Sequence, residues 1–118
     1  MYSRMHPYIP GVKIADQDTA TIGAYHTSDV PCWFGIRPTR NWTAYDRELS
    51  TKMTDALISF AKTGDPNTAG VKWPAWGPGR EQLVEFGNSV NVQGMNTPRL
   101  DFLAARGAPT ATPLAARD

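Results

Sequence analysis

The longest regular pattern of apolar and polar positions runs from Tyr45 to Thr63 and predicts an amphipathic α-helix. Its apolar residues share one stripe at the 3.6-residue spacing of a helix: Leu49, Met53, Ala56, Leu57, Phe60 and Ala61. Thr43 precedes this run and Asp46 follows Thr43 by three residues, which is an acidic form of the capping box. Gly64 ends the pattern as a glycine that can adopt a left-handed conformation. We expect this helix to lie on a sheet, with the stripe in the core.

A second pattern, alternation with a period of two, predicts β-structure. Leu83–Phe86 and Ser89–Gln93 alternate on either side of Gly87-Asn88, which is typical of a β-hairpin. Met1–His6 also alternates between large and polar residues and predicts a sheet strand, which Pro7 ends because proline cannot donate a ladder hydrogen bond.

The C-terminal region predicts one short helix followed by a tail. Leu100–Ala105 can form a helix, with Thr97 as its N-cap and Pro98 at its first position. From Gly107 onward bulky apolar residues are scarce, so we expect residues 107–118 to be disordered.

Composition narrows the classes of function. Lysine and arginine number 12 against 11 acidic residues, a formal net charge of +1, so no nucleic-acid partner and no anionic membrane surface is predicted. No apolar run reaches the roughly 18 residues of a membrane span. Cys32 is the single cysteine, and its spacing to His6 and His26 does not predict a metal site, so we expect no metal and no cofactor. The first residues form no signal peptide, which makes a cytoplasmic location the default expectation.

The best candidate for chemistry is His26, which lies in the segment Gly23–Pro31 between a small-residue turn and Asp29. A histidine that acts as a general base needs one imidazole nitrogen directed at a proton and the other held by a hydrogen bond. This pattern suits such a base, but it more often belongs to a half-buried loop histidine with a structural hydrogen bond. The residues by themselves leave both readings open.

Three motifs in this order resemble the type-B carboxylesterases, the α/β-hydrolase family that includes the cholinesterases. Gly-Ala-Tyr-His-Thr-Ser-Asp at 23–29, followed by Trp33-Phe34-Gly35, resembles the segment of the catalytic histidine. Phe-Ala-Lys-Thr-Gly-Asp-Pro-Asn at 60–67 resembles the family's helix end, and Trp-Pro-Ala-Trp at 73–76 resembles its Trp-Pro-x-aromatic motif. The resemblance extends from Met1 to about Leu103 and corresponds to the C-terminal quarter or fifth of such an enzyme.

The resemblance implies ester hydrolysis through an acyl-enzyme, in which serine attacks, histidine takes its proton and an acid holds the imidazole. It assigns the catalytic histidine to His26 and a supporting carboxylate to Asp29. The nucleophile motif Gly-x-Ser-x-Gly and a His-Gly-Gly oxyanion motif do not occur in this sequence. Ser28 and Cys32 are the alternative nucleophiles near His26, but Ser28 is too close in sequence for in-line attack and Cys32 lies in an apolar run that favours the unreactive thiol.

The expectation is therefore an α/β chain that forms the C-terminal part of an α/β-hydrolase. It comprises one sheet strand, the histidine loop, one long amphipathic helix, a small β-hairpin and a short terminal helix, with residues 1–106 as the esterase part and 107–118 as the tail. We expect a segment of a serine esterase that is inactive alone, whose partners are an ester substrate and the missing N-terminal part of the domain. A non-catalytic remnant or interaction module is the alternative. The acyl and alcohol preferences stay open because the family builds those pockets mainly from other segments, and a secreted or periplasmic parent enzyme stays open too.

Overall fold

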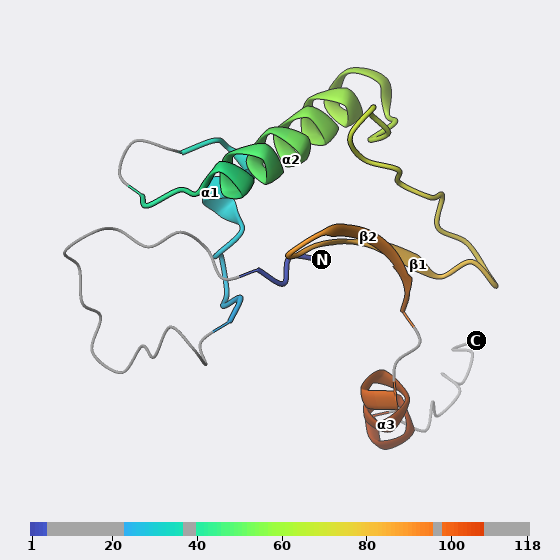
Figure 1. The fold of residues 1–118 in the computed structure, drawn as a ribbon. Helices are drawn as coiled ribbons and strands as arrows, with labels where there is room; N and C mark the ends of the chain where they lie inside the picture. Colours follow the sequence, from blue (N-terminus) through green and yellow to red (C-terminus); the bar gives the residue numbers. More distant parts are fainter. Residues whose placement is uncertain (5–22, 37–39, 96–97, 108–118) are drawn as a thin grey trace, which may run out of the picture.

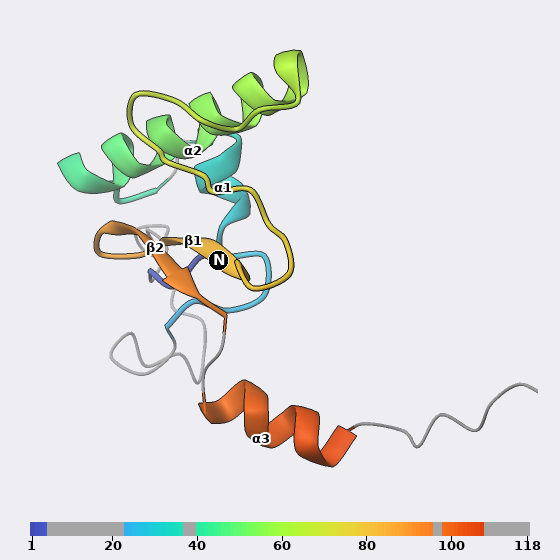
Figure 2. The same cartoon turned by 90° about the vertical axis from the view of Figure 1, so that its right-hand side faces the viewer.

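The computed structural model describes residues 1–4, 23–36, 40–95 and 98–107 (Figure 1). The elements in chain order are α1 (Val30–Trp33), α2 (Ala44–Thr63), β1 (Gln82–Phe86), β2 (Val90–Gly94) and α3 (Pro98–Gly107). Figures 1 and 2 show α2 lying across one side of the β1–β2 hairpin, with α1 beside the N-terminal half of α2 and α3 standing apart. The predicted combination of a long helix, a hairpin and a short terminal helix is confirmed.

Helix α2 begins one residue before the predicted start, and local chemistry fixes both of its ends. The Thr43 hydroxyl accepts a hydrogen bond from the Asp46 backbone N–H at 3.1 Å, and the Asp46 carboxylate accepts one from the Thr43 N–H at 2.9 Å, which completes the capping box. At the other end Gly64 has φ 78°, and its N–H donates to the Phe60 carbonyl at 2.8 Å. A left-handed residue here satisfies a carbonyl that the helix itself leaves free.

The apolar stripe of α2 is buried only in part. Leu49, Met53 and Ala56 are at most 1% exposed, whereas Leu57 is 37% and Phe60 55% exposed. The expectation that the whole stripe lies in the core is therefore wrong for its C-terminal half, because only the N-terminal half lies against α1 and the hairpin. Within the described residues the core comprises eight buried apolar residues: Cys32, Trp42, Leu49, Met53, Ala56, Val71, Val84 and Phe86.

The hairpin forms as predicted, with antiparallel β1 and β2 in the register Val84 opposite Val92 and Phe86 opposite Val90. Val84 and Phe86 are both 1% exposed, so β1 directs its alternate side chains into the core. Of the predicted N-terminal strand, Tyr2 forms a parallel bridge with Phe86. The predicted strand's last residues, 5 and 6, lie outside the described residues.

Helix α1 is absent from the sequence-based prediction. Four residues are too few to display helical periodicity, although the proline at its start is a residue that the first turn of a helix tolerates. Gly35, with φ 60°, turns the chain directly after it. Helix α3 extends from Pro98 to Gly107 and so includes the first residue of the predicted tail, while the rest of that tail and the predicted cap Thr97 lie outside the described residues. In the part of the chain that the structure describes, no helix has both the length and the apolar character needed to cross a membrane.

Candidate active site

The histidine segment is a pair of successive tight turns that leads directly into α1. The Ser28 N–H donates to the Tyr25 carbonyl at 3.0 Å, and the Val30 N–H donates to the Thr27 carbonyl at 3.2 Å. Thr27 has φ 65°, an unusual conformation for a β-branched residue, and its hydroxyl donates to the His26 carbonyl at 2.6 Å. The chain around His26 is thus held in a specific backbone conformation, and the His26 side chain is exposed.

Asp29, the predicted supporting carboxylate, contacts α1 rather than the imidazole. It is the N-cap residue of α1, and its Oδ2 accepts a hydrogen bond from Trp33 Nε1 at 3.0 Å. The Trp33 ring packs edge-on against Phe86, with ring centroids 5.4 Å apart. Among the described residues, no side chain hydrogen-bonds the His26 imidazole. Asp29 therefore joins the histidine segment to the core through Trp33.

Neither alternative nucleophile near His26 is exposed. The Ser28 residue is 2% and Cys32 1% exposed. Burial raises the pKa of the Cys32 thiol, which donates a hydrogen bond to the Tyr2 hydroxyl at 3.5 Å. Burial likewise raises the pKa of Tyr2. The Cys32 thiol is therefore neutral at ordinary pH and enclosed, which is the environment of a structural cysteine.

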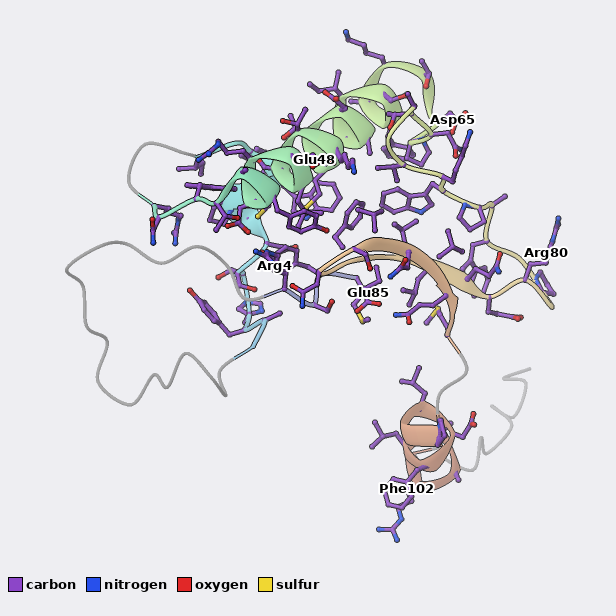
Figure 3. All side chains as sticks on the ribbon, in the orientation of Figure 1. Arg4, Glu48, Asp65, Arg80, Glu85 and Phe102 are labelled. Atoms are coloured by element: carbon purple, nitrogen blue, oxygen red, sulfur yellow. The ribbon has the colours of Figure 1, made fainter. Side chains whose placement is uncertain are left out.

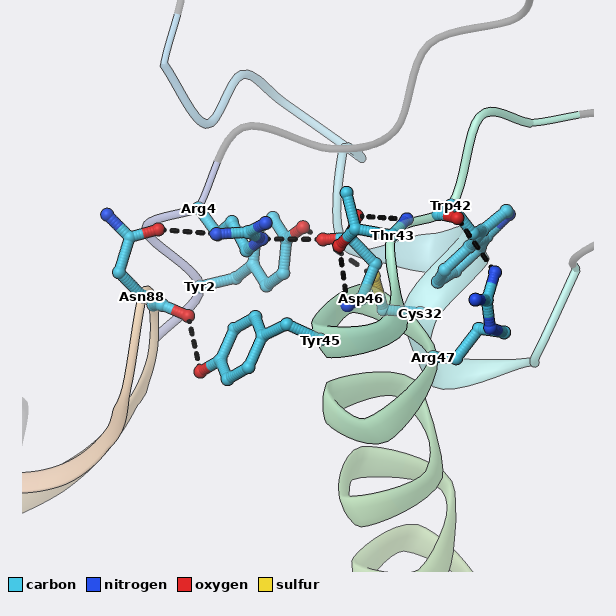
Figure 4. A network of polar contacts seen from close by, with 10 residues as sticks. Tyr2, Arg4, Cys32, Trp42, Thr43, Tyr45, Asp46, Arg47 and Asn88 are labelled. Atoms are coloured by element: carbon cyan, nitrogen blue, oxygen red, sulfur yellow. Dashed lines mark hydrogen bonds and ion pairs between the residues drawn. The ribbon is translucent and has the colours of Figure 1, made fainter.

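A polar network joins the N-terminal residues, the start of α2 and the turn of the hairpin (Figure 4). Arg4 Nε lies 2.6 Å from Asp46 Oδ1, and Arg4 Nη1 donates to Asn88 Oδ1 at 2.5 Å. The Arg4 guanidinium also lies 4.9 Å from the centre of the Tyr45 ring, whose hydroxyl donates to the Gly87 carbonyl at 3.1 Å. Figure 3 shows Arg4 between α2 and the hairpin, whereas Phe102 projects from the distant α3.

The charge state of Asp46 reflects two opposed effects. Burial alone would raise its pKa, but the hydrogen bonds from Arg4 and Thr43 outweigh burial and hold the pKa of Asp46 below its ordinary value. Asp46 is consequently ionised at neutral pH and serves both as a cap of α2 and as the anion of the pair with Arg4.

Metal chemistry finds no support in the described ranges, where no group of three or more histidine, cysteine or carboxylate residues comes together. Sequence reasoning missed the Arg4–Asp46 pair because 42 residues separate its members and no local pattern links them. It also missed Ser50, which is 0% exposed within the helix stripe. A serine on the apolar face of a predicted helix is a signal that could have identified it.

Comparison with known proteins identifies the family. The model of the carboxylesterase family matches residues 1–103. A thermophilic PNB esterase superimposes with a TM-score of 0.58 at 28% identity, over 68% of this chain and 17% of that chain. A PNB esterase gives a TM-score of 0.58 at 30% identity, over 68% of this chain and 16% of that chain. Another PNB esterase structure, at 24% identity and a TM-score of 0.58, covers 81% of this chain and 19% of that chain, and shares the fold.

The chain thus spans less than a fifth of the length of each of these esterases. The resemblance that the three sequence motifs indicated is confirmed, because the family model extends over all of the residues that carry them. The chain belongs to the carboxylesterase family.

Proposed function

We propose that this chain is the segment of a serine carboxylic-ester hydrolase that supplies the catalytic histidine, His26, and that it is inactive by itself. The observation that carries the proposal is the placement of His26, exposed on a tightly hydrogen-bonded turn whose far end is fixed in the core by α1. An exposed side chain on a rigid backbone suits a base that must meet groups from another part of a larger protein.

In the proposed reaction the imidazole of His26 takes the proton of a serine hydroxyl as that oxygen attacks the ester carbonyl. It then returns the proton to the leaving alkoxide, and the same sequence with water releases the acid. An acidic residue must hold the second imidazole nitrogen, and backbone N–H groups must stabilise the oxyanion. In this proposal these groups come from the rest of the esterase domain, while Asp29 supports the turn through Trp33.

Neither Ser89 nor Ser28 offers a replacement nucleophile. The sequence most similar to a nucleophile motif, Gly87-Asn88-Ser89-Val90-Asn91, lacks the closing glycine and runs from the hairpin turn into β2. A nucleophile elbow instead requires a turn from a strand into a helix. Ser28 is buried beside the histidine turn.

The test is a chimera in which this chain replaces the matched stretch of the PNB esterase. The chimera, the chain alone and the esterase without that stretch are assayed on a chromogenic acetate ester. We expect saturable turnover from the chimera alone, and background hydrolysis from the other two. Saturable turnover by the chain alone that Ser28→Ala or Cys32→Ala abolishes would overturn the proposal, as would a folded but inactive chimera.

A non-catalytic interaction module is the second candidate, and the exposed apolar side chains favour it. Leu57, Ile58 and Phe60 on α2 and Trp76 after it are 37% to 65% exposed. Large apolar side chains left exposed to water are typical of a surface that binds another protein. A folded, inactive chimera together with concentration-dependent association of the chain in sedimentation velocity would favour this alternative.

A further inference from the structure

The carbonyl groups of the short helix α1 divide into those bonded within its own segment and those bonded by α2. The Asp29 carbonyl accepts from the N–H groups of Cys32 and Trp33 at 2.9 and 3.0 Å. The carbonyls of Val30 and Pro31 accept from the N–H groups of Phe34 and Ile36 at 3.2 and 2.9 Å. All of these bonds therefore stay within residues 29–36. The carbonyls of Cys32 and Trp33 remain, as the last carbonyls of any helix do.

Two hydroxyl groups of α2 satisfy these remaining carbonyls. Ser50 Oγ donates to the Cys32 carbonyl at 2.8 Å, and Thr54 Oγ1 donates to the Trp33 carbonyl at 3.1 Å, with a longer contact of 3.4 Å to Cys32. Ser50 is 0% exposed, so this hydroxyl would carry an unmet desolvation cost without its partner. The Ser50–Cys32 bond links residues 18 positions apart and the Thr54–Trp33 bond links residues 21 positions apart, so both join α1 to α2 directly.

Two other hydroxyl groups of the same helix, those of Thr51 and Thr63, provide a comparison. Thr51 Oγ1 donates to the Arg47 carbonyl at 3.0 Å, and Thr63 Oγ1 donates to the Ser59 carbonyl at 2.8 Å, both four residues earlier. This back-bonding within a helix is the usual contact of a helical serine or threonine. Ser50 and Thr54 instead point their hydroxyl groups across to α1, so their role is specific to the contact between the two helices.

We propose that Ser50 and Thr54 are positioning residues for His26, an inference that rests on the proposed catalytic role of that histidine. By fixing the C-terminal carbonyls of α1, they set where this helix lies on α2. Asp29, the N-cap of α1, is three residues from His26, and the Asp29–Trp33 side-chain bond closes the unit. A displacement of α1 is therefore transmitted to the imidazole, and a base displaced by about 1 Å can lose about a hundredfold in rate.

Hydrogen exchange measured on the full chain tests the structural half of this inference. Thr54→Val removes one hydroxyl while keeping the side-chain shape, Ser50→Ala removes the other, and Thr54→Ser keeps the hydroxyl. Thr51→Val is the matched control on the same helix. We expect the amides of Ser28, Cys32 and Trp33 to exchange roughly tenfold faster in Ser50→Ala and Thr54→Val, and at the parent rate in Thr54→Ser and Thr51→Val.

Unprotected amides in α1 of the parent chain would contradict the arrangement. Amide exchange in the β1–β2 hairpin that accelerates as much as in α1 would overturn the positioning role, because it would indicate general destabilisation. Exchange in α1 that stays at the parent rate in both Ser50→Ala and Thr54→Val would also overturn it, because the two hydroxyl groups would then not anchor α1. Because this readout needs no activity, it stays informative if the chimera with the PNB esterase is inactive and the proposed function fails.

Activity of the chimera tests the functional half. We expect kcat to fall by about 10- to 100-fold in the Ser50→Ala, Thr54→Val double variant with KM nearly unchanged, because the base is misplaced while ester binding is not. Thr54→Ser should restore most of the loss relative to Thr54→Val, and Thr51→Val should have parent activity. An unchanged kcat in the double variant, or the same loss in Thr51→Val, would overturn the inference.

Discussion

The pair between Arg4 and Asp46 should be among the strongest single contributions to the stability of this chain. Replacing Asp46 by Asn keeps the side-chain shape but removes the charge. Replacing Arg4 by Met keeps most of its apolar stem and removes the guanidinium. Both changes act on a contact that joins the N-terminal residues to the first turn of α2.

The expected loss follows from what the Asp46 carboxylate receives. The Asp46 side chain is 6% and that of Arg4 22% exposed, so water screens the pair only partly. The carboxylate accepts from Arg4 Nε, from the Thr43 N–H and from the Thr43 hydroxyl at 2.6, 2.9 and 2.7 Å. In Asp46→Asn the amide NH2 group takes the place of one carboxylate oxygen, so its N–H groups face either the Arg4 guanidinium or the Thr43 donors and the corresponding hydrogen bonds are lost. A hydrogen bond to a charged group contributes about 1.5–3 kcal/mol and an N-cap about 1 kcal/mol. We therefore expect Asp46→Asn to lower the free energy of unfolding by about 2–4 kcal/mol and Arg4→Met by about 1–3 kcal/mol.

Urea denaturation followed by circular dichroism at pH 7 measures these losses, and the double variant gives the coupling energy. We expect a coupling of about 1–3 kcal/mol between the two residues. Thr43→Ala, which breaks the capping box without touching Arg4, should cost about 1 kcal/mol and serves as the control for the cap alone. A coupling below about 0.5 kcal/mol would refute the reasoning, because that is the value of an exposed pair.

The same contact predicts the sign of a pH effect. The pKa of Asp46 lies below its ordinary value in the folded chain, so its contribution to stability is complete above the ordinary carboxyl pKa of about 4 and is lost as the pH falls through the folded-state pKa. The difference in stability between the parent and Asp46→Asn should shrink in acid. A difference that stays constant from pH 7 to pH 2 would contradict this assignment.

Three further predictions concern other parts of the fold. The buried Cys32 thiol should react with a maleimide orders of magnitude more slowly in the native chain than in urea, and equal rates would contradict its enclosure. Gly64→Ala should lower the free energy of unfolding by about 1 kcal/mol through backbone strain alone, because φ is 78° and no atom lies within 4 Å of the added methyl; Gly94→Ala, which also has open space but no positive φ, should cost little in the same denaturation assay. Asn67→Ala should speed amide exchange at Trp73 several-fold, since the Asn67 side chain accepts from the Trp73 N–H at 2.7 Å and donates to its carbonyl at 3.1 Å, and an unchanged rate would contradict that contact.

The parts of the fold that the sequence predicts are those determined by neighbouring residues. The capping box of Thr43 and Asp46, the terminal Gly64 and the hairpin turn at Gly87-Asn88 all arise within a few positions of the chain. The exposed half of the α2 stripe illustrates the limit, because periodicity identifies an apolar face without identifying what covers it. Phe60 belongs to the same stripe as Met53, yet it is 55% exposed and Met53 is 0% exposed.

The candidate site divides in the same way. The resemblance of residues 23–35 to the family's histidine segment singles out His26 as the candidate, whereas its turn alone does not. Helix α1 is too short for a periodic signal, and the contact of Asp29 with Trp33 depends on that helix. The bond from Ser50 to the Cys32 carbonyl joins residues 18 positions apart and depends on how α1 lies on α2, which no local pattern determines.

The catalytic role of His26 is the central claim, and kcat of variants of the chimera tests it most directly. The parent chimera, His26→Ala and Asp29→Asn are compared on the same ester, with folding checked by circular dichroism. We predict that His26→Ala lowers kcat by at least about a thousandfold, because it removes both the general base and the later general acid. Asp29→Asn should cost far less, because its Oδ2 only braces α1 through Trp33. Retention of more than about a tenth of the activity in His26→Ala, or an equal loss in Asp29→Asn, would contradict the assignment.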